Sequence, residues 1–157
     1  MKNNNIYGNS PLHDAAFAGN IEQLKQLILE HADVNTCNKD DETPLHLATV
    51  RNQTQSVKLL LAAGANVNAE NKYGNTPLHN AAGSGNPAIL QILIDANARV
   101  NIQNSKGMSP LHIATKKGFD KIVQFLIHHG ADVQLKNSLG QTAFDLAPTE
   151  EMKTWLL

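Results

Sequence analysis

Four copies of one tetrapeptide decide the fold: Ser10-Pro11-Leu12-His13, Thr43-Pro44-Leu45-His46, Thr76-Pro77-Leu78-His79 and Ser109-Pro110-Leu111-His112. A worn fifth copy follows as Thr142-Ala143-Phe144-Asp145, and each copy starts 33 residues after the one before. The chain has 157 residues, so this period runs through almost its whole length. A period of this size is typical of a stack of repeated units rather than of a domain with one central core.

Further features recur with the same period. An alanine lies two places after each tetrapeptide, and an asparagine lies five places before each Ser or Thr. The alanines are Ala15, Ala48, Ala81, Ala114 and Ala147, and the asparagines are Asn5, Asn38, Asn71, Asn104 and Asn137. A second signature, Ala-x-Val followed by Asn or Gln, closes the period at 32–35, 65–68, 98–101 and 131–134.

Each copy predicts two short helices and a turn. Ser or Thr followed by Pro is typical of a helix start. The hydroxyl accepts from free backbone N–H groups of the first turn, and Pro at the first position has no N–H that would need a partner. Gly19, Gly85 and Gly118 then end the first helix, and Gly64 and Gly130 end the second, where a positive φ is needed. Stretches rich in Asn and Gly, such as 71–75, predict turns that project from the helices.

The pattern Gly-x-Thr-Pro-Leu-His-x-Ala-Ala, then a leucine-rich helix and Gly-Ala-Asp-Val-Asn, resembles the ankyrin repeat over residues 5–157. The resemblance implies an all-α helix-turn-helix solenoid with projecting β-turn or hairpin loops. It divides a single domain, 1–157, into repeats at about 5–37, 38–70, 71–103 and 104–136 with a capping repeat at 137–157. It also implies that Asn35, Asn68 and Asn101 can be hydroxylated, the alternative being that they anchor the turn.

Four residues depart from the family's glycines, and we expect them to change only local geometry. Asp41 replaces the turn glycine of the second copy, and Asn52 replaces a glycine that ends the first helix. His31 and Asn97 replace the glycine after the second helix. Asn97 suits a positive φ, whereas at His31 we expect a strained or reshaped helix end.

The two ends of the chain read as caps of the stack. In the first copy, Asp14 and Gln26 stand where inner copies have apolar residues, which predicts a solvated N-terminal face. Thr149-Glu150-Glu151 predicts the start of a final helix, since acidic residues favour the first turn. We expect Trp155, Leu156 and Leu157 to cover the other end.

Composition excludes several classes of function. Charged residues make up 17% of the chain and the formal net charge is −1, which disfavours nucleic acid or an anionic membrane as the main partner. The start of the chain lacks the apolar stretch of a signal peptide, and no run is long enough to span a bilayer. We therefore predict a cytoplasmic or nuclear protein, while a secreted effector that enters a host cell stays open.

No residues form a recognisable catalytic or metal site. The four tetrapeptide histidines lie in different layers, about 8–10 Å apart, so they cannot all reach the short ligand distances of a zinc ion. We interpret each as a hydrogen-bonding bridge between turn and helix within its own repeat. Cys37, the single cysteine, lies in a turn with no evident base, and no phosphate-binding loop or hydrolase motif is present. We predict no enzymatic activity, no cofactor and no metal.

Function is expected at the positions that differ among otherwise matching copies. These are the turn tips, the residues two places further on, and the ends of the first helices, which in similar proteins line the concave face and contact protein partners. The candidate partner-binding residues are Tyr7, Asn9, Phe17, Asp40, Glu42, Val50, Arg51, Tyr73, Asn75, Lys106, Met108, Lys116 and Lys117. Acidic residues at 40–42 and the lysines of the fourth copy suggest a partner with a basic segment at the second repeat and an acidic one at the fourth.

The sequence thus favours a non-enzymatic module for protein–protein interaction: a scaffold, an adaptor or an inhibitor. We expect a monomer that binds a protein partner, with no small-molecule substrate and no membrane insertion. An alternative is the interaction domain of a larger enzyme or a secreted bacterial effector, whose catalytic part lies outside this chain. Direct catalysis is disfavoured, and a weak nucleic-acid contact at Lys106, Lys116, Lys117 and Lys121 is the remaining possibility.

Overall fold

A computed structural model describes residues 6–157, so Asn5, the first of the periodic asparagines, lies outside the described residues. Across residues 6–157 the chain forms ten α-helices and no strand. The helices are α1 (Pro11–Ala18), α2 (Ile21–Leu29), α3 (Pro44–Val50), α4 (Thr54–Ala62), α5 (Pro77–Ser84), α6 (Pro87–Asp95), α7 (Pro110–Lys117), α8 (Asp120–His128), α9 (Ala143–Leu146) and α10 (Glu150–Trp155). The all-α prediction is confirmed.

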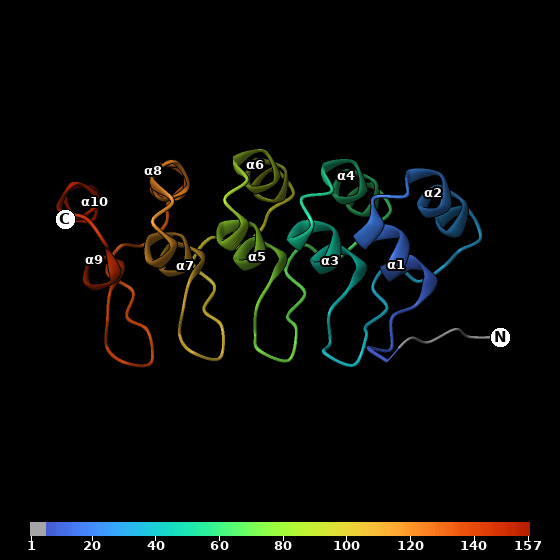
Figure 1. The fold of residues 1–157 in the computed structure, drawn as a ribbon, viewed down its shortest axis with the longest axis horizontal. Coiled ribbons are helices and arrows are strands. Elements are labelled where there is room, and N and C mark those ends of the chain that lie inside the picture. The colour runs from blue at the N-terminus through green and yellow to red at the C-terminus, as the bar shows by residue number, and fades with distance from the viewer. Residues whose placement is uncertain (1–5) are drawn as a thin grey trace.

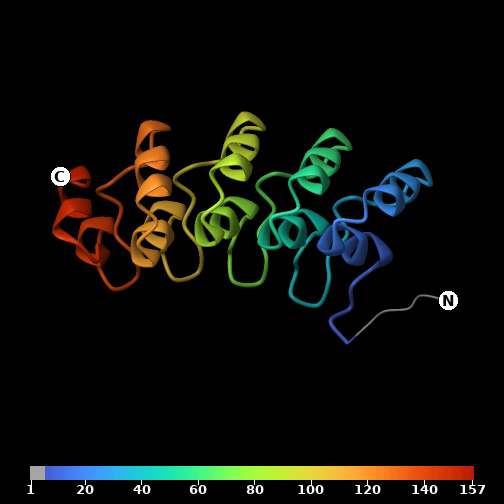
Figure 2. The same cartoon turned by 45° about the horizontal axis from the view of Figure 1, so that its top comes forward.

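The helices form two rows, with a third row of loops along one side (Figure 1). The odd-numbered helices pack side by side in one row and the even-numbered helices in the other, which Figure 2 shows lengthwise. The loops project from the row of odd-numbered helices. Each period therefore supplies one helix pair and one loop, as the sequence predicted.

The predicted helix starts are present in every copy. The residue before each odd-numbered helix, for example Thr43 or Ser109, is extended, and its backbone N–H donates to the side chain three residues on. In four copies that side chain is the histidine of the tetrapeptide, and in the last it is Asp145. Proline is the first residue of four of these helices, where its missing N–H has no cost.

Within residues 6–157, four residues other than glycine adopt a left-handed backbone, and they are the four departures named from the sequence. The φ angles are 61° at His31, 57° at Asp41, 56° at Asn52 and 66° at Asn97. The helix end at His31 is not reshaped: the N–H of Ala32 donates to the carbonyl oxygen of Leu27 (3.0 Å), as the N–H of Ala98 does to that of Leu93 (2.9 Å) after Asn97.

The core lies between the two rows of helices and is continuous from α1 to α10. Its largest side chains, such as Leu24, Leu60 and Leu93, are completely buried because each helix pair covers the next. At the N-terminal end, Asp14 and Gln26 are exposed, which confirms the predicted solvated cap.

The C-terminal cap differs from the prediction in two residues. Leu156 is buried and Trp155 packs against the core, but Leu157 is 87% exposed and covers nothing. Met152, which the prediction omitted, is fully buried one helical turn before Leu156. The hydroxyl of Thr149 accepts from the backbone N–H of Met152 (3.2 Å), so the final helix starts where predicted.

Candidate partner-binding groove

A groove runs along the inner angle between the loops and the odd-numbered helices, and three hollows follow one another in it. The first hollow (350 Å³) lies between the first two repeats and includes Tyr7, Phe17 and Leu47. The central hollow (450 Å³) includes Val50, Asn80, Gly83 and Ile113. The basic hollow (770 Å³) joins the fourth repeat to the capping repeat, and includes Lys106, Met108, Lys116, Lys117, Leu139 and Leu146.

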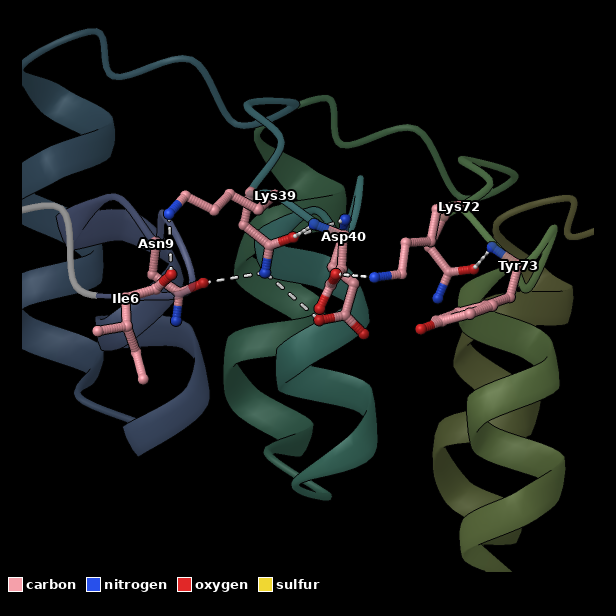
Figure 3. A network of polar contacts seen from close by, with 9 residues as sticks. Ile6, Asn9, Lys39, Asp40, Lys72 and Tyr73 are labelled. Atoms are coloured by element: carbon pink, nitrogen blue, oxygen red, sulfur yellow. Dashed lines mark hydrogen bonds and ion pairs between the residues drawn. The ribbon is translucent and has the colours of Figure 1, made fainter.

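The loops that form one wall of the groove are tied to each other through their backbones. The N–H of Lys39 donates to the carbonyl oxygen of Tyr7, and that of Lys72 to Asp40, each at 3.0 Å. The same bond joins Ser105 to Tyr73 and Ser138 to Lys106. Figure 3 shows this edge in the first three repeats, where Lys39 also donates to the carbonyl oxygen of Ile6 and Lys72 pairs with the Asp40 carboxylate. The wall is therefore one hydrogen-bonded strip rather than separate loops.

Within each loop, the periodic asparagine holds the turn closed. Oδ1 of Asn71 accepts from the backbone N–H groups of Tyr73 and Asn75, both at 3.0 Å. Asn38, Asn104 and Asn137 make the same pair of bonds in their own loops. Three of these asparagines are buried and Asn104 is half-buried, and the bonds that they make explain why the position is constant from Asn38 onward.

The tetrapeptide histidines join neighbouring repeats, which corrects the prediction that they act within one repeat. Nδ1 of His79 accepts from the backbone N–H of Thr76 (3.1 Å) in its own repeat, but Nε2 lies 2.9 Å from the carbonyl oxygen of Met108 in the next. A carbonyl oxygen only accepts, so Nε2 must carry the proton and Nδ1 must be bare. His13, His46 and His112 bond in the same way to Glu42, Asn75 and Gln141.

Burial lowers the pKa of all four of these histidines, because the charged imidazolium would lose its hydration. The effect on His79 is large and brings its pKa to about 4. The backbone carbonyl that each Nε2 meets raises the pKa, but by less than burial lowers it. These imidazoles are thus neutral structural groups at physiological pH, not acid–base catalysts.

The fifth copy differs from the others at the position of the histidine. Asp145 stands where the other copies have histidine, and its Oδ2 accepts from the N–H (2.8 Å) and hydroxyl (3.0 Å) of Thr142. These bonds lower the pKa of the Asp145 carboxyl. A carboxylate caps the helix with acceptors alone, whereas an imidazole would also bring a second ring nitrogen that needs a partner.

The structure divides the thirteen predicted site residues into two groups. Eight are exposed: Tyr7, Phe17, Val50, Arg51, Tyr73, Lys106, Lys116 and Lys117. Five are half-buried and bonded to neighbouring side chains or loops: Asn9, Asp40, Glu42, Asn75 and Met108. The side chains of this second group therefore already make contacts inside the stack. Comparing the copies in the sequence could not distinguish such contacts from a role in binding.

The hollows bring most of these residues together. Tyr7, Asn9, Phe17, Asp40 and Glu42 meet in the first hollow, and Lys106, Met108, Lys116 and Lys117 meet in the basic hollow. Val50 and Asn75 line the central hollow. Arg51 and Tyr73 line none of the three hollows: the Arg51 guanidinium lies over the Phe17 ring (4.7 Å), and the Lys72 ammonium lies over the Tyr73 ring (5.0 Å).

Sequence reasoning missed the floor of the groove. In the second to fifth copies, the residue before the constant alanine faces the hollows, as Leu47, Asn80, Ile113 and Leu146 do. Its variation from copy to copy was the available signal. Asn80 differs from its apolar counterparts, and its buried Nδ2 has no hydrogen-bond partner among the described residues.

The acidic and the basic end of the groove differ in how their charged groups are paired. The Asp40 carboxylate pairs with Lys72, and the Glu42 carboxylate accepts from Nδ2 of Asn38 (3.4 Å). The lysines of the basic hollow have no such partner: within residues 6–157, no carboxylate lies in ion-pair distance of Lys106, Lys116 or Lys117. The positive charge without an ion-pair partner therefore lies at the C-terminal end of the groove, whereas the partner of Glu42 in the first hollow is a neutral amide, which does not cancel a charge.

The chemistry of the remaining candidates is structural. The amide group of Asn68 makes two hydrogen bonds to the next repeat. Its Nδ2 donates to the carbonyl oxygen of Asn97 (3.2 Å), and its Oδ1 accepts from the backbone N–H of Arg99 (2.8 Å). Asn35 and Asn101 do the same. The pKa of the Cys37 thiol is raised, mainly by partial burial and further by the negative charges of nearby aspartates, so less of it is thiolate.

Residues 6–157 contain no group of three or more His, Cys, Asp or Glu side chains arranged to hold a metal ion. None of their helices combines the length and the apolar character needed to cross a bilayer.

Comparison with known proteins agrees with this geometry. The sequence model of the family described as ankyrin repeats (3 copies) matches residues 12–104, 66–137 and 81–152. A search of curated proteins finds no significant match. Ankyrin repeats are generally modules for protein–protein interaction and are typically not catalytic. With this overlapping match over nearly all its length, the chain belongs to the ankyrin repeat family.

Proposed function

We propose that this chain is a non-enzymatic protein-interaction module whose groove binds an extended segment of a protein partner. The observation that carries the proposal is the contrast between constant and variable positions. The constant residues, such as Leu78, Ala81 and Asn71, are buried or bonded within the stack. The variable residues line three successive hollows on one side of it.

The physical basis of binding is preorganisation. The loop wall is fixed by the backbone bonds between Lys39 and Tyr7 and their equivalents, and the floor is fixed by the helix packing. A partner segment then meets a surface that needs little ordering, which lowers the entropic cost of association. The groove offers both exposed apolar groups, such as Phe17 and Val50, and charge.

We propose that the module acts as a scaffold, an adaptor or an inhibitor, all of which use the same surface. We assign the interaction to the cytoplasm or nucleus and propose that residues 1–157 act as one monomeric domain. Light scattering of the purified chain tests the last point, since a dimeric mass would contradict it.

The experiment that tests the function compares three matched proteins as baits in a cell extract. These are the wild type, a groove variant (Tyr7→Ser/Val50→Ser/Lys116→Ser) and an outer-face variant (Gln55→Ala/Lys58→Ala/Gln124→Ala), all exposed positions. We expect a protein partner that the wild type and the outer-face variant retain and the groove variant loses. Partners lost only by the outer-face variant would contradict the proposal.

A further inference from the structure

The basic hollow brings together three lysines that have no ion-pair partner within residues 6–157. Some basic side chains elsewhere are paired, such as Lys25 with Glu22 and Lys72 with Asp40, and others in the described part of the chain, such as Lys58 and Lys121, are unpaired but lie outside the hollows. At the basic hollow, Lys106 from one loop and Lys116 and Lys117 from one helix end line the same space without a carboxylate in ion-pair distance among the described residues. Such an arrangement attracts a negatively charged ligand and repels a positively charged one.

The floor of the basic hollow is apolar. Met108, Ile113 and Leu146 are half-buried there, and Leu139 lies 82% exposed at the tip of the last loop. When a partner covers apolar surface that otherwise faces water, the complex is stabilised by about 25 cal/mol for each Å² buried. The ligand therefore needs an apolar group in addition to its negative charge.

The size of the hollow fits side chains of a partner rather than an ion. Its 770 Å³ falls within the range of about 300–1,000 Å³ that is typical of ligand sites. It continues into the central hollow, with which it shares Ile113 and Lys117, so a longer segment can follow the groove.

We infer that the basic hollow binds an acidic segment of a protein partner in which a Leu, Ile, Met or Phe side chain is flanked by Asp or Glu. The apolar side chain lies on Ile113 and Leu146, and the flanking carboxylates meet Lys106, Lys116 and Lys117. This inference rests on the proposed function and specifies the partner's chemistry. Single-stranded nucleic acid fits less well, because no aromatic ring for base stacking lines the hollow.

The test begins with a random peptide library displayed on phage and selected on the immobilised full chain at low salt. The selected sequences are then synthesised with a fluorescent label and titrated with four proteins. These are the wild type, the groove variant, Lys116→Glu/Lys117→Glu, and Lys58→Glu/Lys121→Glu, which makes the same change of net charge outside the hollow. Circular dichroism checks that each variant is folded, and a labelled single-stranded oligonucleotide serves as the competing probe.

We expect selected peptides rich in Asp and Glu beside one apolar residue. Their Kd should rise about tenfold or more in Lys116→Glu/Lys117→Glu, remain within about twofold in Lys58→Glu/Lys121→Glu, and weaken with added salt. Peptides that lose binding in the groove variant but carry no acidic residues would overturn the inference and leave the proposed function intact. Peptides that bind the groove variant as well as the wild type would overturn both. Tighter binding of the oligonucleotide, lost on reversal of the two lysines, would replace the peptide with nucleic acid.

Discussion

Mild acid should destabilise this protein through the histidines that join its repeats. In the folded chain, Nδ1 of His79 accepts a backbone N–H and Nε2 donates to a carbonyl oxygen, so the ring has no place for a second proton. Protonation at Nδ1 would set an N–H against the N–H of Thr76 and break the helix cap. The same holds for His13, His46 and His112, whose pKa values are also lowered.

The size of the effect follows from the pKa of His79. In the unfolded chain a histidine has a pKa of about 6.5, whereas in the stack that of His79 is lowered to about 4. Between these values the unfolded state binds more protons, so the stability is complete above pH 6.5 and falls as the pH falls toward 4. Going from pH 7 to pH 5, His79 alone removes about 2 kcal/mol from the free energy of unfolding. The other three histidines add to the loss in the same direction.

Urea unfolding followed by circular dichroism at pH 7, 6 and 5 measures this loss directly. Proton NMR of the imidazole Hε1 atoms then identifies the groups, with His79→Gln used to assign its resonance. The carboxyl of Asp145 does not interfere, since its lowered pKa places its contribution below this pH window. An unfolding free energy that stays constant from pH 7 to pH 5, or a His79 signal that titrates near pH 6.5, would refute the reasoning.

Three substitutions test other parts of the stack by urea unfolding. Gly140→Ala should lower the free energy of unfolding by about 1–2 kcal/mol, the strain of a side chain at positive φ, because no atom of the described residues lies near the new Cβ. Gly107→Ala should lower it clearly more, because its Cβ would lie 2.7 Å from the backbone of the next loop, and equal losses would contradict the tight packing between loops. Asn80→Leu should raise the stability by about 1 kcal/mol, because it removes a buried donor without a partner and introduces the side chain that Leu47 has at the same position of the second copy. A loss of stability would show that this amide has a hydrogen-bond partner. Met152→Ala should lower the stability by about 2–5 kcal/mol or release the last helix, and an unchanged midpoint would mean that this helix does not cap the core.

The repeated elements were predictable because each rests on local chemistry. A Ser or Thr before Pro starts a helix wherever it occurs, and a position that needs positive φ shows glycine or a tolerated substitute. A comparison of the copies therefore predicts both the helix starts and the four left-handed residues, including His31. The same comparison placed the variable residues on one face.

Contacts between repeats were not predictable in the same way, because a sequence period does not say which atoms of neighbouring units meet. Nε2 of His13 reaches Glu42, 29 residues away, and the carboxylate of Asp40 meets Lys72. These pairings turned part of the expected acidic surface into an internal contact. The buried amide of Asn80 was missed for a related reason, since only packing shows that a polar residue has no partner.

Each junction between repeats contains the same two bonds, from a histidine and from a loop N–H, and both end on main-chain oxygens that any residue possesses. Removal of residues 71–103 would bring the imidazole of His46 to the carbonyl oxygen of Met108 in place of that of Asn75. Insertion of a second copy of these residues would create one new border, at which His79 of the first copy would meet the carbonyl oxygen of Asn75 in the second. Because the partners at such a border do not depend on the side chain of the acceptor, the stack can be lengthened or shortened by whole repeats without new chemistry at its junctions.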